Sequence, residues 1–396
     1  MKQLSISIAA AMLVLASTYA TAADVEIDVQ NLDPSAQTQT NSDGAIQDAS
    51  TGRAHEIAAG GEVDININGG ATNQTQNTSV GAFQFSNVGV AASMDGSSSA
   101  TITTNDAVTN QTQDTSAGAL QFSNVGVAES MNGSSSATIT ANNVEVNQTQ
   151  TNSNSAQYSE AGVASNISGG SNATITANQA EITQTQTNSA GSIQASQAGV
   201  AYSIDGGSNA TITANQAEIT QTQTNSASSQ GSRVGMVEGA YVGSSAEVTA
   251  NQAKVTQTQI NTNGSDQYTG VGVVEDLSND ANVKVIANHA TVTQRQNNAD
   301  ASLQNTQVGA ASYIEGADID ITANHVGVTQ RQRGLTGGDQ LAQVGAVVGE
   351  LGNPITVDAD ITVANAENIT QFQDASNNAK QTKRVGVVTN GTYYRF

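Results

Sequence analysis

Residues 178–186, which read NQAEITQTQ, decide the fold of this chain. Aligned on the first glutamine of the QxQ pair, the same pattern occurs ten times, in steps of 36 or 37 residues and of 41 at the end. These glutamines are Gln37, Gln74, Gln111, Gln148, Gln184, Gln221, Gln257, Gln294, Gln330 and Gln371. A strict period of this length is typical of a repeat architecture in which each unit stacks on the next.

Four polar positions and one glycine recur in every copy. An asparagine stands six residues before the first glutamine, a second glutamine two residues after it, a third seven or eight further on, and a glycine five after that. In two central copies these residues are Asn178, Gln184, Gln186, Gln194 and Gly199, and Asn215, Gln221, Gln223, Gln230 and Gly235. We expect them to form structural ladders, because buried amides need partners and identical amides stacked in register supply them.

Alternation of residue types indicates strands. In one run every second residue is apolar or an amide, from Ala180 through Ile182 to Gln186, and threonines or Glu181 lie between them. A shorter run places Ala173, Ile175 and Ala177 on one face. A third run is predicted to share one face among Gln194, Ser196, Ala198, Val200, Tyr202 and Ile204, matched in an earlier copy by Gln84, Ser86, Val88, Val90, Ala92 and Met94. Each copy is therefore predicted to contain three strands.

The turns and corners complete the predicted coil. Gly-rich segments at 131–136, 168–171 and 205–208 separate strands. The inward parity jumps at Asn178, since Ala177 and Ala180 both point inward, and an asparagine there tolerates the unusual backbone angles of a corner. Thr, Val, Ile, Asn and Gly are weak helix formers. The sequence therefore predicts an all-β fold, a parallel β-solenoid of ten coils with about three strands per coil and Asn/Gln ladders, roughly 50 Å long.

The N-terminal segment has the features of a secretory signal peptide. Lys2 precedes an apolar run, and Ala20, Thr21 and Ala22 form a small-residue cleavage site. We expect residues 1–22 to be the signal and residues 23–396 to form one repeat domain of an extracellular, surface-associated protein. The chain has no cysteine, so disulfides do not hold it together. The first and last copies, which contain Pro34 and Pro354, are expected to be atypical capping copies.

Charge excludes one class of partner. The formal net charge is −22, and no Lys or Arg occurs between Arg53 and Arg233. Because phosphate contacts need basic side chains, we expect no nucleic-acid binding. Basic residues gather in the final copy, at Lys380, Lys383, Arg384 and Arg395.

The motif at residues 178–184, with Asn178, Ala180, Ile182 and Gln184 at spacings of two, is similar to the curlin repeat of curli, the amyloid-like fibres of enteric bacteria. The curlin unit is shorter and has two strands, and its GlyxGly step is absent here. The resemblance implies an exported subunit that polymerises with itself on the cell surface into biofilm matrix fibres. It also implies a nucleator subunit and an outer-membrane export pore as partners.

Residues for catalysis or metal binding are sparse. His289 and His325 follow the corner asparagines of neighbouring copies, and we interpret them as an exposed corner pair rather than a metal site. Asp318 and Asp320, with Asp358 and Asp360 in the next copy, could stack as a calcium cluster, but solvated charge is the preferred interpretation. We therefore expect that the protein is not an enzyme and that it binds no cofactor and no metal.

Outward side chains offer further alternatives. Threonine pairs such as Thr174 and Thr176 resemble the rows of β-helical ice-binding proteins, although strand preference also explains them. Phe85, Phe122 and Tyr158 recur at one outward place and are expected to stack as an external ladder or, alternatively, to form an adhesive patch. The closing residues 393–396, TyrTyrArgPhe, could be an anchor, an export signal or a frayed end.

Open strand edges at both ends with matching amide rows favour templated addition of another copy. The leading hypothesis is a secreted fibre subunit. The alternatives are a monomeric adhesin or ice-binding rod and a β-helix enzyme acting on polysaccharide, although no copy carries the insertions that would build a catalytic cleft.

Overall fold

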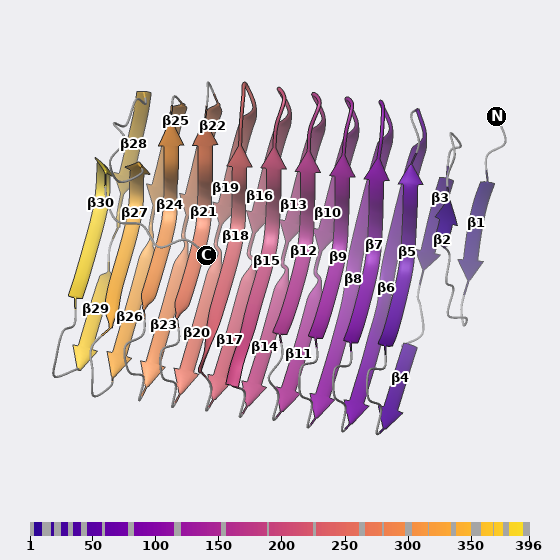
Figure 1. The fold of residues 1–396 in the computed structure, drawn as a ribbon, viewed down its shortest axis with the longest axis horizontal. Helices are drawn as coiled ribbons and strands as arrows, with labels where there is room; N and C mark the ends of the chain where they lie inside the picture. Colours follow the sequence, from indigo (N-terminus) through magenta and orange to yellow (C-terminus); the bar gives the residue numbers. More distant parts are fainter. Residues whose placement is uncertain are drawn as a thin grey trace.

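The fold is a parallel β-solenoid, as the repeat predicts. The computed structural model describes residues 4–9, 17–19, 25–30, 35–40, 46–57, 60–77, 83–114, 120–151, 156–187, 190–224, 227–260, 266–278, 281–297, 303–315, 317–333, 338–349, 358–366, 368–374 and 380–390. All strand pairings among them are parallel, and their two sheets run side by side along the long axis (Figure 1).

The larger sheet wraps around a corner and so forms two walls of the solenoid. One wall contains β1 (Leu4–Ala9), β3 (Val25–Gln30), β10 (Ser136–Asn142), β13 (Asn172–Asn178), β16 (Asn209–Asn215), β19 (Ser245–Asn251), β22 (Asn282–Asn288), β25 (Asp318–Asn324) and β28 (Asp358–Ala364). The next wall contains β4 (Ser35–Thr40), β11 (Glu145–Thr151), β14 (Glu181–Thr187), β17 (Glu218–Thr224), β20 (Lys254–Ile260), β23 (Thr291–Asn297), β26 (Gly327–Arg333) and β29 (Ile369–Asp374). β6 (Glu62–Asn77) and β8 (Ser99–Asp114) run through the corner and belong to both walls.

The smaller sheet forms the third wall. Its strands are β2 (Ser17–Tyr19), β5 (Ile46–Ile57), β7 (Phe83–Met94), β9 (Leu120–Met131), β12 (Ala156–Ile167), β15 (Ala190–Ile204), β18 (Ala227–Ala240), β21 (Gln267–Ser278), β24 (Gln304–Glu315), β27 (Asp339–Gly349) and β30 (Lys380–Asn390). Eight regular coils run from β6 to β27 within the described residues, and the coils of β3–β5 and β28–β30 lie at the two ends. The predicted ten coils therefore reduce to eight complete turns with atypical ends.

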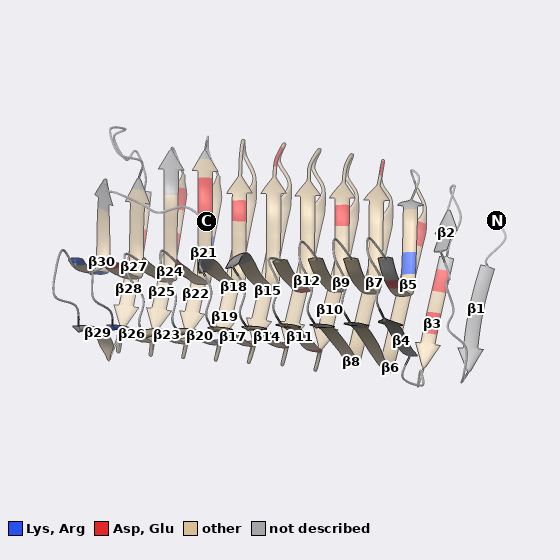
Figure 2. Ribbon diagram, turned by 60° about the horizontal axis from the view of Figure 1, so that its bottom comes forward, with Lys and Arg blue, Asp and Glu red and all other residues tan. Residues whose placement is uncertain are grey.

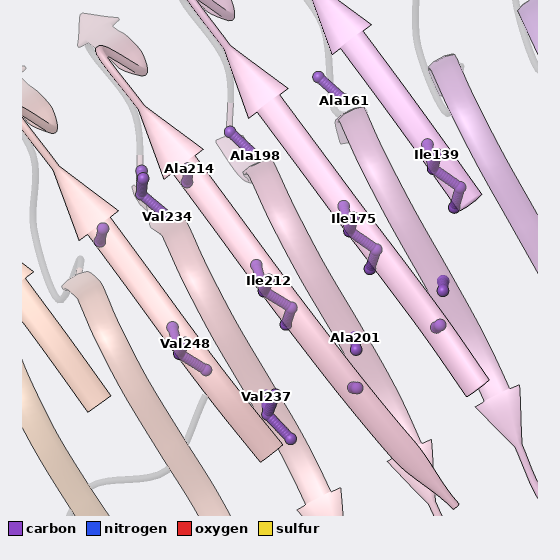
Figure 3. Close-up of a cluster of buried hydrophobic side chains, with 14 of the residues drawn as sticks. Ile139, Ala161, Ile175, Ala198, Ala201, Ile212, Ala214, Val234, Val237 and Val248 are labelled. Carbon is purple, nitrogen blue, oxygen red and sulfur yellow. The ribbon is translucent and has the colours of Figure 1, made fainter. Parts of the chain in front are cut away.

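The core is built from layers of identical residues. Ile139, Ile175 and Ile212 stack from consecutive coils, and alanines from the smaller sheet, such as Ala161 and Ala198, face them across the interior (Figure 3). All five side chains are fully buried. Each coil contributes little apolar area, but the stacking makes one continuous core along the axis.

The corner lies at the predicted place, but a different residue makes the turn. Ala177 and Ala180 are both buried, which confirms the parity jump. The left-handed backbone angle falls on the following residue, Gln179 at φ 53°, and not on Asn178. Asn178 instead keeps a strand conformation, and its amide donates to Asn142 Oδ1 at 3.0 Å.

At the centre of the third wall, the prediction of which side chains point inward is wrong. The recurring glycine has a positive φ, 62° at Gly199, so the alternation shifts there by one residue. Ala201 consequently points into the core, whereas Val200 and Tyr202 lie on the outer face. Ser203, at φ 52°, is a second left-handed residue and returns Ile204 to the core. The corresponding glycines are Gly52, Gly89, Gly126, Gly162, Gly235, Gly272, Gly309, Gly345 and Gly386, all with positive φ.

Candidate functional site

The glutamine ladders run along the inside of the solenoid. The amide nitrogen of each ladder glutamine donates to Oε1 of the equivalent glutamine one coil earlier, as Gln184 does to Gln148 and Gln221 does to Gln184, both at 2.9 Å. Gln186 and Gln223 continue the second ladder, and Gln194 and Gln230 the third. All seven of these side chains are at most 1% exposed.

The same amides also join two walls of each coil. Gln184 Nε2 lies 3.0 Å from the backbone oxygen of Ala195 and 3.2 Å from Ser159 Oγ, both on the opposite wall. Ser159 Oγ in turn donates to Gln148 Oε1 at 2.9 Å. The predicted ladder residues are therefore brought together. Serines such as Ser196 were expected to face inward, but their part in the network was not predicted. Its signal was the serine or threonine two residues after seven of the ten third glutamines.

Because every ladder bond points in the same direction, the solenoid has a polarity. At the last coil Gln371 donates to Gln330 at 2.8 Å and Gln381 donates to Gln340 at 2.9 Å. Among the described residues, none donates to Oε1 of Gln371 or Gln381. The last coil thus ends in amide acceptors.

The last coil also leaves apolar positions uncovered. Ile361 and Val363, whose equivalents Ile321 and Ala323 are fully buried, are only partly buried. Val388 is 49% exposed, and Phe372 is 45% exposed although it lies over Arg331 at 5.4 Å. An unpaired strand edge with an apolar inner row is a template for adding another strand.

The edge of the first coil is partly occupied by the predicted signal segment. β1 pairs in parallel with β3, placing Ile6 beside Ile27 and Ile8 beside Val29, and β2 pairs with β5. This pairing requires residues 1–22 to be present, because β1 and β2 lie within them. The expected cleavage site at residues 20–22, together with Pro34 and Pro354, lies outside the described residues.

Lys383 departs from the consensus of the last coil. It stands at an inward position that is Ser, Thr or Ala in the other described copies, for example Ala342 and Thr306. Those residues are fully buried, whereas Lys383 is exposed at the open end. An inward-pointing charge on an edge strand opposes pairing with another strand.

The outer face of the smaller sheet carries a second apolar cluster that the sequence did not predict. It is a row along the axis: Val90, Val127, Val163, Val200, Met236, Val273 and Ala310. Two side chains per strand flank this row, as Gln197 and Tyr202 do on β15. We call the row and its flanking side chains the outer row. The outer row was missed because simple alternation placed Val200 on the inward face.

The pKa values of ionisable groups along the outer row are shifted. Burial, aided by the nearby Glu129, raises the pKa of Glu160 to about 7. Burial also raises the pKa of Tyr202, whose hydroxyl accepts a hydrogen bond from Arg233 at 2.7 Å. Arg233 forms an ion pair with Glu238 at 3.0 Å; burial opposes its charge, but Tyr202, Glu238 and Glu275 raise its pKa on balance. These contacts join the side chains on the two sides of the outer row.

On the wall of β16, β19, β22, β25 and β28, the outer face has a shallow hollow of about 520 Å³ whose lining includes charged residues. Glu247 accepts a hydrogen bond from Lys284 at 2.8 Å, which raises the pKa of Lys284. Asp320 and Asp360 lie in register on adjacent strands. No group of three or more His, Asp or Glu side chains in the described ranges is placed to hold a metal ion.

The histidine and aromatic pairs have the predicted geometry. His289 and His325 stack with ring centroids 4.6 Å apart. Phe122 stacks on Phe85 at 5.3 Å and on Tyr158 at 5.0 Å, which confirms an external aromatic ladder. Since the ring faces lie against one another, this ladder offers mainly ring edges to a partner. Residues 393–396 lie outside the described residues.

Acidic residues are spread along the solenoid (Figure 2), in keeping with the net charge of −22. None of the segments that the structure describes forms a helix long and apolar enough to span a membrane.

These features define a class: a parallel β-solenoid with internal amide ladders and one open terminal coil. Searches against protein-family models, curated proteins and solved structures find no match for this chain. What the protein does must therefore be inferred from its own geometry.

Proposed function

We propose that this chain is a secreted structural subunit that assembles end to end into extracellular fibres, of the kind that form a biofilm matrix and support surface adhesion. The observation that carries the proposal is the open last coil, where Gln371 and Gln381 present acceptors and Ile361 is only partly buried. A following copy would bring Gln37 and Gln47 to the same ladder positions, since their register on Gln74 and Gln84 continues the period.

The mechanism is strand addition in register. The pairing of β1 on β3 is an instance of a parallel strand added at the edge of the first coil, and removal of the predicted signal would leave that edge open. The amide rows fix the register, because a slip of one residue would turn every inward amide outward. The acidic surface discourages lateral association and so favours growth along the axis.

The first test is assembly of residues 23–396 after dilution from denaturant, followed by electron microscopy and by seeding of fresh protein. We expect unbranched fibres that seed. Persistent single rods would contradict the proposal and favour the monomeric adhesin or ice-binding rod.

A matched pair of variants tests the end-to-end contact. Ile361→Lys places a charge in the inner row of the open coil, and Thr362→Lys places the same charge on the exposed outer face of the same strand. Ile361→Lys should abolish seeded elongation, whereas Thr362→Lys should leave it nearly unchanged. Equal rates for the two variants would show that the open coil is not the growing contact.

A further inference from the structure

One outward row of side chains follows the wall of β3 and β28 from coil to coil. In register, the row consists of Glu26, Asp64, Thr101, Thr138, Thr174, Thr211, Glu247, Lys284, Asp320 and Asp360. We call it the carboxylate row. Its four central members are uncharged threonines, and its last two members at either end are carboxylates.

Within the chain, a cation separates two carboxylates of this row. Lys284 donates to Glu247 Oε1 at 2.8 Å, and Asp320 lies in register on its other side. The hydrogen bond to Glu247 and the charges of Glu247 and Asp320 raise the pKa of Lys284. Beyond Asp320 the row continues directly to Asp360, a second exposed carboxylate. Like charges directly opposite each other on neighbouring strands are destabilising.

Stacking of a second copy would lengthen this run of carboxylates. Glu26 and Gln37 occupy the same places in the first coil as Asp360 and Gln371 do in the last. The ladder register therefore sets Glu26 of the following copy beside Asp360. Four carboxylates then follow one another at about 4.8 Å per coil, in the order Asp320, Asp360, Glu26 and Asp64. This spacing is shorter than the Debye length of about 8 Å at physiological ionic strength, so neighbouring charges repel each other.

We propose that the carboxylate row makes end-to-end stacking dependent on cations. At low ionic strength the copies repel each other at this wall, and counter-ions from the medium relieve the repulsion. The inference rests on the proposed function and adds its regulation. The repulsion belongs to the junction, because Asp360 and Glu26 meet only where two copies stack. Since the register is fixed, a cation introduced on either side would turn the repulsion into attraction.

Charge reversal on either side of the junction tests this contact in residues 23–396, with each variant seeded by its own fibres. Asp360→Lys places a cation between Asp320 and Glu26 of the following copy, which repeats the arrangement at Lys284. Glu26→Lys does the same from the other side of the junction. Each single variant should elongate at least several-fold faster than the unaltered protein. The double variant sets two lysines against each other and should elongate more slowly than either single variant.

This order of rates separates the contact from the overall charge. Both substitutions lower the net negative charge, so a general effect would make the double variant the fastest, and that result would overturn the proposal. Glu181→Lys is the matched control, because Glu181 stands between Glu145 and Glu218 in a row of like charges within one chain. It should leave the elongation rate nearly unchanged. Acceleration equal to that of Asp360→Lys would also overturn the proposal.

Ionic strength provides a second measurement. Between about 0.01 M and about 0.1 M salt the Debye length falls from about 30 Å to about 10 Å. The unaltered protein should elongate several-fold faster at the higher concentration, and Asp360→Lys should show a clearly smaller rise. Fibres that respond equally to salt with and without this substitution would overturn the inference but leave the proposed function intact. Absence of fibres under every condition would overturn both.

Discussion

A single ladder glutamine binds both its axial neighbours and the opposite wall of its own coil. Replacing Gln184 with Ala would leave Gln148 Oε1 and Gln221 Nε2 without their axial partners in a dry interior. We expect Gln184→Ala to lower the free energy of unfolding by about 2–4 kcal/mol, because it removes the buried hydrogen bonds of Gln184 to Gln148, Ser159, Ala195 and Gln221, each worth about 0.5–1.5 kcal/mol. The outward Thr183→Ala should cost less than about 1 kcal/mol.

Both variants are compared by chemical denaturation of the monomer. The same pair at the next coil, Gln221→Ala and Thr220→Ala, serves as an independent repeat. Gln→Ala should also slow fibre assembly more than Thr→Ala. Equal effects of the inward and outward substitutions would refute the ladder argument.

Glu160 should make stability depend on pH. Its pKa of about 7 in the folded chain lies above the ordinary value of 4.5, because burial and Glu129 disfavour the charged form. The folded chain therefore holds this proton more tightly than the unfolded chain, and the stability gained is fully present below pH 4.5 and lost as pH rises through 7. The difference amounts to at most about 3 kcal/mol.

We expect Glu160→Gln to remove this loss of stability at higher pH. The test is the free energy of unfolding, measured between pH 4.5 and 7.5. Glu129 and Tyr202 face the same carboxyl, so both must be kept unchanged. Glu181→Gln, on the exposed face of β14, is the charge-matched control. A wild-type pH profile that persists in Glu160→Gln would rule out this assignment.

At the scale of the element, the recurring glycine sets the shape of the third wall. A Cβ at Gly199 would lie 3.2 Å from Ala214 Cβ and 3.3 Å from Ile212 Cγ2, in addition to the strain of φ +62°. Gly207, in the exposed turn after β15, has φ +74° but nothing within 4 Å. Gly199→Ala should therefore destabilise the chain by about 1–2 kcal/mol more than Gly207→Ala, because tight contacts add to the strain.

Thermal unfolding of the two variants checks this difference. The backbone strain is common to both, so the comparison isolates crowding against the neighbouring wall. Similar losses of stability would mean that the walls do not approach as closely as Gly199 requires.

The same element explains which part of the fold could be predicted from the sequence. Period-two alternation predicted β13 and β14 correctly, since every residue in them has an ordinary strand conformation. It placed Val200 and Tyr202 wrongly because two left-handed residues, Gly199 and Ser203, shift the alternation and then restore it. The glycine itself was visible as a fixed position, but alternation alone does not reveal the sign of φ. The outer row was missed for this reason.

At the scale of the whole molecule, the axial polarity of the ladders and the difference between the ends follow from stacking. The sequence predicted identical amides in register, and the structure adds that all donors point toward the first coil. The inward position of Lys383 follows from the repeat, because Ser196 was predicted to face inward at the same place. The repeat does not show that this side chain is left exposed at an open coil. Lys383 is the feature of the open end that most opposes another coil.

Replacing Lys383 with Ser restores the residue type of the other coils and should accelerate seeded elongation. The new hydroxyl would stand where Ser232 donates to Gln221 at 2.9 Å, so it could donate to Gln371 in the same way. Burying a lysine at a coil junction requires desolvation of its charge, which costs several kcal/mol without a partner. We therefore expect an increase of about tenfold or more in the elongation rate, since about 1.4 kcal/mol corresponds to a factor of ten.

Lys380→Ser is the matched control, because it removes the same charge from an exposed position on the same strand. If elongation were limited by general charge repulsion, the two variants would behave alike. A faster rate only for Lys383→Ser would identify this side chain as a brake on end-to-end stacking. A slower rate would mean that the lysine takes part in the contact between copies, and the open coil would have to be joined through its charge.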